Sequence, residues 1–118
     1  MKILIVHDGK NGNIAELWTP ELSRLGTITE AVGSTQALLT LHAEPAFNFL
    51  IISVSLGDTK GADLIREIRA DARTEHLACA LVGALTQVTD TVPLKAAWIS
   101  STYPIERLSE LIGRLAKT

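Results

Sequence analysis

The stretch KILIVHDGKNGN, residues 2–13, joins a short apolar run to a polar loop that contains two glycines. The continuously apolar residues 3–6 are typical of a strand in a sheet that helices cover on both faces. The loop carries His7 and Asp8 directly after this strand, which leaves three interpretations open. It is an acidic pocket, a loop that binds phosphate, or the degenerate form of one of these.

The rest of the chain alternates between apolar runs and segments with helical spacing. Further strands are predicted at residues 49–54 and 78–85, which are nearly continuously apolar, and at 27–32 and 96–100, where the pattern is weaker. Between them, apolar residues recur every three or four positions, as on one face of a helix. They are Ile14, Leu17, Leu22 and Leu25; Ala37, Leu38 and Leu41; Leu64, Ile65 and Ile68; and Ile105, Leu108, Leu111, Ile112 and Leu115.

This alternation predicts the fold class α/β, with a single doubly wound open sheet of five parallel strands and five helices on both faces. Such an arrangement is flavodoxin-like. We expect residues 1–118 to form one domain, because 118 residues suffice for one core but not for two. The fourth helix, within residues 86–97, should be short or irregular, since this segment contains three threonines and Pro93.

Several residues mark the predicted helix ends. Ser34 is a candidate N-cap of the second helix, and Pro104 suits the first turn of the last helix. Gly26 lies where the first helix should stop. Pro20 falls inside that first helix, so it should either kink the helix or mark a second start at Thr19.

The composition excludes several classes of function. The formal net charge of −2 and the charged fraction of 20% create no strong field, so we expect no binding to nucleic acid or to an anionic membrane. The single cysteine, Cys79, cannot form an intramolecular disulfide, which favours a reducing cytoplasm, and its apolar surroundings predict a buried small residue. No signal peptide is visible, and no apolar run reaches the roughly 20 residues that span a bilayer.

Ligands of a doubly wound sheet bind at the carboxyl ends of the strands, near the point where strand order reverses. The residues to consider are His7 and Asp8, residues 53–58 and 83–85, and the end of the fifth strand. The segments KILIVHD, FNFLIISVSLGDTKGADLIREIR and HLACALVGAL together resemble receiver domains of two-component response regulators. The likeness in order, spacing and apolar pattern covers essentially the whole chain.

The resemblance implies a phosphorylation pocket in which most functional groups are replaced. Receivers close the first strand with two acids, the third with a phosphoacceptor aspartate, the fourth with threonine or serine, and the fifth with lysine. The matching positions here are His7, Asp8, Ser53, Gly83 and, for the lysine, either Ser100 or Tyr103. Asp8 alone keeps the residue type of the family. The resemblance therefore points to an atypical pseudo-receiver that lacks the phosphoacceptor aspartate.

The chemistry of these replacements predicts a loss of phosphotransfer. An acyl phosphate needs a carboxylate nucleophile and a Mg²⁺ ion held by neighbouring carboxylates. The hydroxyl of Ser53 is a weak nucleophile without an adjacent base, and Asp8 beside His7 is a poor site for Mg²⁺. We therefore expect a phosphorylation-independent bacterial signalling domain with no enzymatic activity, catalytic residue, metal or cofactor.

Such a domain should signal through contacts with a protein partner or with a second copy as a homodimer. In receivers, the face formed by the fourth helix, the fifth strand and the fifth helix commonly binds partners, and aromatic residues are enriched in interface cores. Trp98 and Tyr103 flank the fifth strand, and with Ile105 and Arg107 they make up the candidate partner surface. The alternative is that Trp98 fills the core beside the shortened fourth helix.

Two motifs near the first strand have further interpretations. Gly12 and Asn13 follow this strand as in the phosphate loop of flavodoxins, which suggests a small-ligand or nucleotide-binding module with an anion near Lys10, or a flavin-binding protein. The simpler interpretation is a flexible polar connection. His7 is either a pH switch beside Asp8 or a strand-end histidine with ordinary hydrogen bonds.

Two sets of polar residues lie elsewhere. Ser53 and Ser55 are either a nucleophile pair or small residues that fill the vacated pocket, and the lack of a Ser-His-Asp order or a nucleophile elbow favours the second. Arg66, Arg69 and Arg73 recur along one helix. Because acids are interleaved with them, they indicate a solvated helix face rather than a phosphate site.

Overall fold

The five predicted strands form one parallel sheet. The structure is a computed structural model, and it describes residues 1–44, 46–87 and 90–117. The order of strands in the sheet is β2-β1-β3-β4-β5, and every neighbouring pair is parallel. Strand order therefore reverses between β1 and β3. The strands are β1 (Lys2–His7), β2 (Thr27–Val32), β3 (Phe49–Ser53), β4 (Ala78–Gly83) and β5 (Ala97–Ser100).

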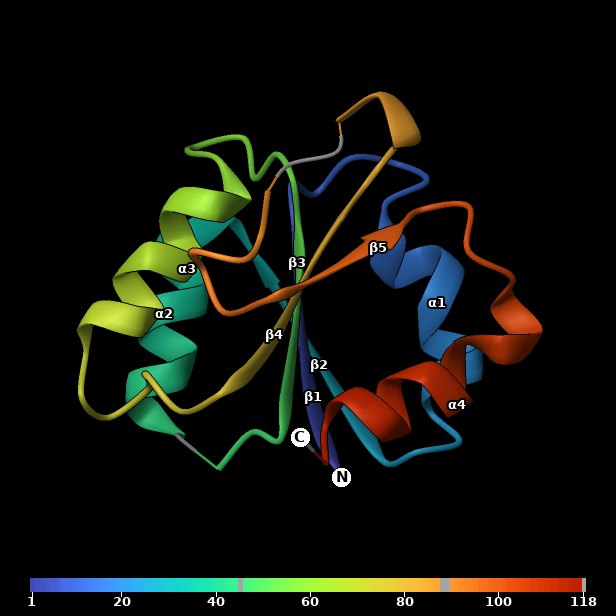
Figure 1. Ribbon diagram of the computed structural model, residues 1–118, viewed down its shortest axis with the longest axis horizontal. Coiled ribbons are helices and arrows are strands. Elements are labelled where there is room, and N and C mark those ends of the chain that lie inside the picture. The colour runs from blue at the N-terminus through green and yellow to red at the C-terminus, as the bar shows by residue number, and fades with distance from the viewer. Residues whose placement is uncertain (45, 88–89, 118) are drawn as a thin grey trace.

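Helices cover both faces of this sheet (Figure 1). The first and last helices pack on one face, and the two middle helices pack on the other. This arrangement is the doubly wound one that the alternation of strands and helices predicts. The helices are α1 (Ile14–Leu22), α2 (Gly33–Ala43), α3 (Gly61–Ala70) and α4 (Ile105–Leu115).

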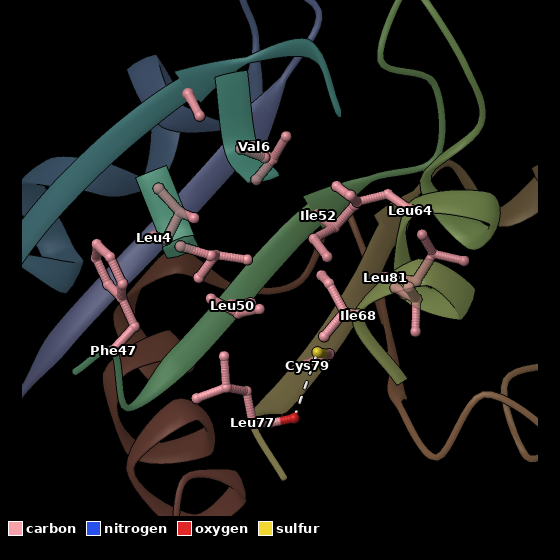
Figure 2. Packing of buried hydrophobic residues seen from close by; sticks show 14 of the residues in the cluster. Leu4, Val6, Phe47, Leu50, Ile52, Leu64, Ile68, Leu77, Cys79 and Leu81 are labelled. Atoms are coloured by element: carbon pink, nitrogen blue, oxygen red, sulfur yellow. Dashed lines mark hydrogen bonds between the residues drawn. The ribbon is translucent and has the colours of Figure 1, made fainter. Parts of the chain in front are cut away.

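Each face of the sheet has its own apolar core. Side chains along a strand point alternately to opposite faces, so the apolar run of β1 serves both cores. Ile3 and Ile5 join the core under α1 and α4, whereas Leu4 joins the core under α2 and α3. Figure 2 shows this second core, where Leu50 of β3 lies near Ile68 of α3.

The predicted fold class is confirmed, with one correction to the helices. Five helices are expected from the sequence, but the described residues contain four α-helices and a 3₁₀ turn, η1 (Leu85–Gln87). Leu85, which the apolar run places in the fourth strand, lies in η1. The β-branched threonines and Pro93 of the connection that follows disfavour a regular helix. Val88 and Thr89 of this connection lie outside the described residues.

One of the predicted helix ends is wrong, and one alternative for Pro20 is excluded. α2 begins at Gly33, so Ser34 lies in its first turn and is not its N-cap. α1 runs through Pro20 to its end at Leu22 with no second start. A proline this close to the end removes only one internal hydrogen bond. Pro104 directly precedes α4, near its first turn as expected.

The N-terminus of α2 is capped by Asp58, a residue of the loop between β3 and α3. Both oxygens of its carboxylate lie 3.1 Å from the backbone nitrogen of Ser34, and one accepts the Ser34 hydroxyl at 2.8 Å. A side chain from a distant loop thus satisfies the free N–H groups that an N-cap residue usually satisfies. The hydrogen bonds from the Ser34 backbone and side chain lower the pKa of Asp58 below its ordinary value.

We expect Asp58→Ala to destabilise the protein in a pH-dependent way. Because the folded-state pKa is lowered, the cap contributes stability above the ordinary value of 3.8 and loses it as pH falls through the folded-state value. The free energy of unfolding in urea should therefore differ most between wild type and Asp58→Ala at neutral pH. The difference should shrink in acid, and a difference that is constant with pH would contradict this role of Asp58.

Candidate functional site

A cavity of about 300 Å³ lies at the carboxyl ends of β1, β3 and β4. Three of the predicted pocket residues, Asp8, Ser53 and Gly83, line it together. We call this space the carboxyl-end cavity. The loops around it lie at the top of the sheet in Figure 1, beside the reversal of strand order between β1 and β3. Ligands of doubly wound folds bind at this place.

His7 turns away from the carboxyl-end cavity. Its ring is buried, with Nε2 3.0 Å from Oε1 of Glu30 on β2, and Nδ1 accepts the backbone N–H of Gly9 at 3.0 Å. Since Nδ1 accepts a hydrogen bond, the neutral ring carries its proton on Nε2 and donates it to Glu30. The interpretation of His7 as a strand-end histidine with ordinary hydrogen bonds describes this geometry. The ring does not line the cavity with Ser53, so it is not placed to act as a base there.

The two candidates for the lysine position, Ser100 and Tyr103, lie outside the carboxyl-end cavity, and a neighbouring residue that sequence reasoning missed lines it instead. Ser100 ends β5 and its Oγ lies 2.8 Å from Oγ1 of Thr102, while Tyr103 packs against the core under α1 and α4. Neither lines the carboxyl-end cavity, but Ser101 does, and its backbone N–H donates to the Gly83 carbonyl at 2.8 Å. Its position directly after β5 was the signal in the sequence that could have identified it as a lining residue. Its side chain offers a hydroxyl and no ammonium group.

Neighbouring side chains fill the space beside Gly83. A Cβ atom at this position would lie 2.5 Å from Cγ2 of Val54 and 3.0 Å from Cη2 of Trp98. A threonine or serine therefore does not fit here unless these side chains move. Trp98 is half-buried and packs against the core under α2 and α3, which matches the interpretation that it fills the core.

The loop after β1 does not leave the N-terminus of α1 open for phosphate. The side chain of Asn13 caps the helix by accepting the N–H groups of Ala15 at 2.9 Å and Glu16 at 3.1 Å. The backbone N–H of Gly12 donates to the Glu16 carboxylate at 2.7 Å. Because the chain's own side chains occupy these donors, the geometry gives no support to a flavodoxin-like phosphate loop.

The prediction of a solvated face for the three arginines of α3 and its C-terminal loop is wrong for Arg69. Its guanidinium donates to four backbone carbonyls: Leu94 at 3.0 Å, Glu75 at 2.7 Å, Leu77 at 2.6 Å and Lys95 at 2.8 Å. We call this set of contacts the Arg69 brace. It joins the end of α3 to the segments that lead into β4 and β5, far from the strand ends that form the cavity.

The other two arginines pair with nearby acids at the surface, as predicted. Arg66 contacts Asp63 at 2.6 Å, and Arg73 contacts Asp71 at 2.8 Å. The hydrogen bonds from Arg73 hold the pKa of Asp71 well below its ordinary range. Cys79 is buried, as expected, and burial raises the pKa of its thiol to about 11. A thiol with so high a pKa is a poor nucleophile at neutral pH.

The four residues of the candidate partner surface differ in exposure. Ile105 is 43% exposed and Arg107 is also exposed, so both are accessible on α4. Trp98 and Tyr103 are half-buried and pack against opposite cores. Among the residues that the structure describes, no helix is long and apolar enough to cross a membrane. The same residues contain no group of three or more His, Cys, Asp or Glu side chains that could hold a metal ion.

No protein-family model matches the chain, and no curated protein matches it. Solved structures do match along nearly its whole length. A putative response regulator from Chloroflexus aurantiacus J-10-fl matches with a TM-score of 0.86 at 19% identity, over 99% of this chain and 98% of that one. A sensor protein from Polaromonas sp. JS666 has a TM-score of 0.84 at 26% identity, over 98% of this chain and 95% of that one.

The receiver domain of NtrX from Brucella abortus gives a TM-score of 0.84 at 20% identity and covers 98% of both chains. The structural neighbours are thus response regulator receiver domains. The chain has their five-stranded flavodoxin-like fold, as the resemblance in sequence predicts.

Proposed function

We propose that this chain is a receiver-like signalling domain that works without phosphorylation, through protein contacts in the cytoplasm. The observation that carries the proposal is the composition of the carboxyl-end cavity. Among the described residues that line it, Asp8 is the only carboxylate, and Ser53 lies where the resemblance places the phosphoacceptor. The receiver fold argues for a role in signalling, and the cavity argues against the usual chemistry of that fold.

Phosphoryl transfer needs several groups at once, and the cavity lacks most of them. A hydroxyl cannot form the acyl phosphate of a receiver, and His7, which faces Glu30, is not placed to activate Ser53. The developing negative charge needs preorganised donors and cations. Gly83 provides no hydroxyl at the end of β4, and Ser101 provides no ammonium group after the end of β5.

We expect acetyl phosphate and Mg²⁺ to leave the intact mass of the wild-type protein unchanged. Ser53→Asp should restore a carboxylate but not a working receiver, because groups that act together in catalysis are strongly non-additive. Its phosphorylation should be at least about 100-fold slower than that of an ordinary receiver, since loss of one transition-state donor alone costs about this much. Intact-mass spectrometry over time, with an ordinary receiver as positive control, measures both. A phosphate adduct on the wild type, or control-like kinetics in Ser53→Asp, would refute the proposal.

The candidate partner surface provides the second test. Ile105→Glu places a charge at its exposed edge and should abolish partner binding, because an unpaired charge in an interface is costly. Leu39→Glu is the matched control, since Leu39 is 65% exposed on α2, on the opposite face of the sheet. The test is a pull-down from the host with the wild type and each variant as bait. A partner that binds the wild type should still bind Leu39→Glu and should not bind Ile105→Glu.

Sedimentation velocity of the same variants distinguishes a separate partner from a homodimer formed through α4 and β5. A concentration-dependent dimer that Ile105→Glu disrupts identifies the second copy as the partner. If Leu39→Glu abolishes association and Ile105→Glu does not, the partner surface is misplaced.

A further inference from the structure

The carboxyl-end cavity contains two opposite charges that the protein does not pair with each other. The carboxylate of Asp8 accepts the backbone N–H of Lys10 at 2.9 Å. Lys10 is also a lining residue of the cavity, and its ammonium group forms no salt bridge with Asp8 or with any other residue of the described ranges. An acidic and a basic residue therefore line one small space, and neither charge is paired with an opposite charge of the described residues.

Neutral polar residues line the same cavity. Ser53 and Ser101 bring hydroxyls to the wall, and Asn11 brings a side-chain amide. Within the part of the chain that the structure describes, none of these three side chains has a hydrogen-bond partner. Ile14 and Val82 add apolar surface. Small-molecule sites combine apolar walls with a few polar groups in this way, and the volume of about 300 Å³ is at the lower end of their range.

The charges exclude the simpler classes of ligand. A lone anion would be attracted by Lys10 but repelled by Asp8, and a lone cation would meet the reverse. A divalent metal would find one carboxylate and otherwise only neutral oxygens, which is little negative charge for a Ca²⁺ or Mg²⁺ site. A phosphate group would find the N-terminus of α1 already capped by Asn13. A ligand with one positive and one negative end satisfies both groups.

We propose that the carboxyl-end cavity binds a small zwitterion of the α-amino acid class. Asp8 receives its ammonium group, Lys10 receives its carboxylate, and Ser53 and Ser101 donate to or accept from its polar atoms. The inference rests on the proposed function, because it uses the space that phosphotransfer chemistry has left. It makes the cavity an input site, at which a metabolite takes the place of the phosphoryl group.

The test is a titration of the ¹⁵N-labelled protein with the proteinogenic L-amino acids, first in pools and then singly. We expect at least one amino acid to shift the amide signals of Ser53, Gly83 and Ser101 in a saturable way. Two analogues of that amino acid, one without the carboxylate and one without the amine, should bind at least about tenfold more weakly, because each loses a charge-assisted hydrogen bond.

Three variants show whether the two charges carry the binding. Asp8→Asn and Lys10→Gln should each weaken it by about tenfold or more, whereas Lys60→Gln, an exposed lysine outside the cavity, should not. Lys10 is exposed in a loop, so Lys10→Gln should keep the fold if Asp8→Asn does not. The inference is overturned if no amino acid gives saturable shifts, if the analogues bind equally well, or if Lys10→Gln binds like wild type. Such a result leaves the proposed function intact, since only the mass measurement decides whether phosphotransfer occurs.

Discussion

Gly61→Ala should lower the free energy of unfolding by about 3 kcal/mol or more, because overpacking against a rigid backbone is costly. Gly61 is the first residue of α3, and a Cβ there would lie 2.2 Å from the carbonyl oxygen of Ser53 and 2.8 Å from Cδ1 of Leu81. The first of these atoms cannot move aside, since Ser53 ends a central strand and pairs with Val82. The backbone N–H of Gly61 also donates to the Val54 carbonyl at 2.8 Å, which holds the helix start against the strand.

The chain contains a matched control for this substitution. Gly113 lies inside α4, and a Cβ there meets no atom within 4 Å. Gly113→Ala should therefore stabilise the protein by up to about 1 kcal/mol through helix propensity alone. Urea unfolding of the two variants under the same conditions gives both values. Equal effects of the two substitutions would show that contact with Ser53 does not determine the choice of glycine at position 61.

Arg69→Ala should cost about 2–4 kcal/mol, because it leaves four backbone carbonyls without the charged donor that they share. Two of them, of Leu94 and Lys95, belong to a segment with an unusual conformation, since Lys95 has a φ of 52° and is not a glycine. Arg69→Lys should recover only part of the loss, because an ammonium group lacks the planar fork that reaches four acceptors.

Arg66→Ala is the control for Arg69→Ala. Arg66 belongs to the same helix and pairs with Asp63 at the surface, so its loss should cost no more than about 0.5 kcal/mol. A second readout comes from Cys79, a buried thiol whose pKa is raised to about 11 and which the Arg69 brace adjoins. An aromatic disulfide reagent should modify Cys79 faster in Arg69→Ala, because the start of β4 opens more often. Similar stability and similar thiol reactivity in both variants would show that Arg69 is a surface residue.

The fold was predictable because its signals are local and repeated. The apolar runs of β1, β3 and β4 and the helical spacing of α4 each follow from burial on one or both faces of an element. The fourth helix is the exception, and its absence as an α-helix from the described residues agrees with the local signal of Pro93. Whether a weak helical segment keeps one helical turn or none depends on packing. The spacing of apolar residues in the sequence does not specify that packing.

The candidate site was predictable in position but not in detail. Asp8, Ser53 and Gly83 come together because parallel strands end at the same edge of the sheet. To identify Ser101 as a lining residue, one has to know where β5 ends. To predict the orientation of His7, one has to know that Glu30 lies beside it on a neighbouring strand. The Asp58 cap and the Arg69 brace each join segments far apart in the sequence. Contacts of this kind produce no periodic pattern in the amino-acid sequence.

The packing beside Gly83 also limits which substitutions can follow one another at this position. A hydroxyl residue at position 83 requires smaller side chains at Val54 or Trp98, because their atoms lie 2.5 and 3.0 Å from its Cβ position. Either of these smaller side chains, introduced first, opens a cavity in the core, and large-to-small changes there cost about 2–5 kcal/mol. Every route of single substitutions to a threonine at position 83 therefore passes through a less stable intermediate. A hydroxyl residue at position 83 therefore requires a coordinated change of at least two core positions.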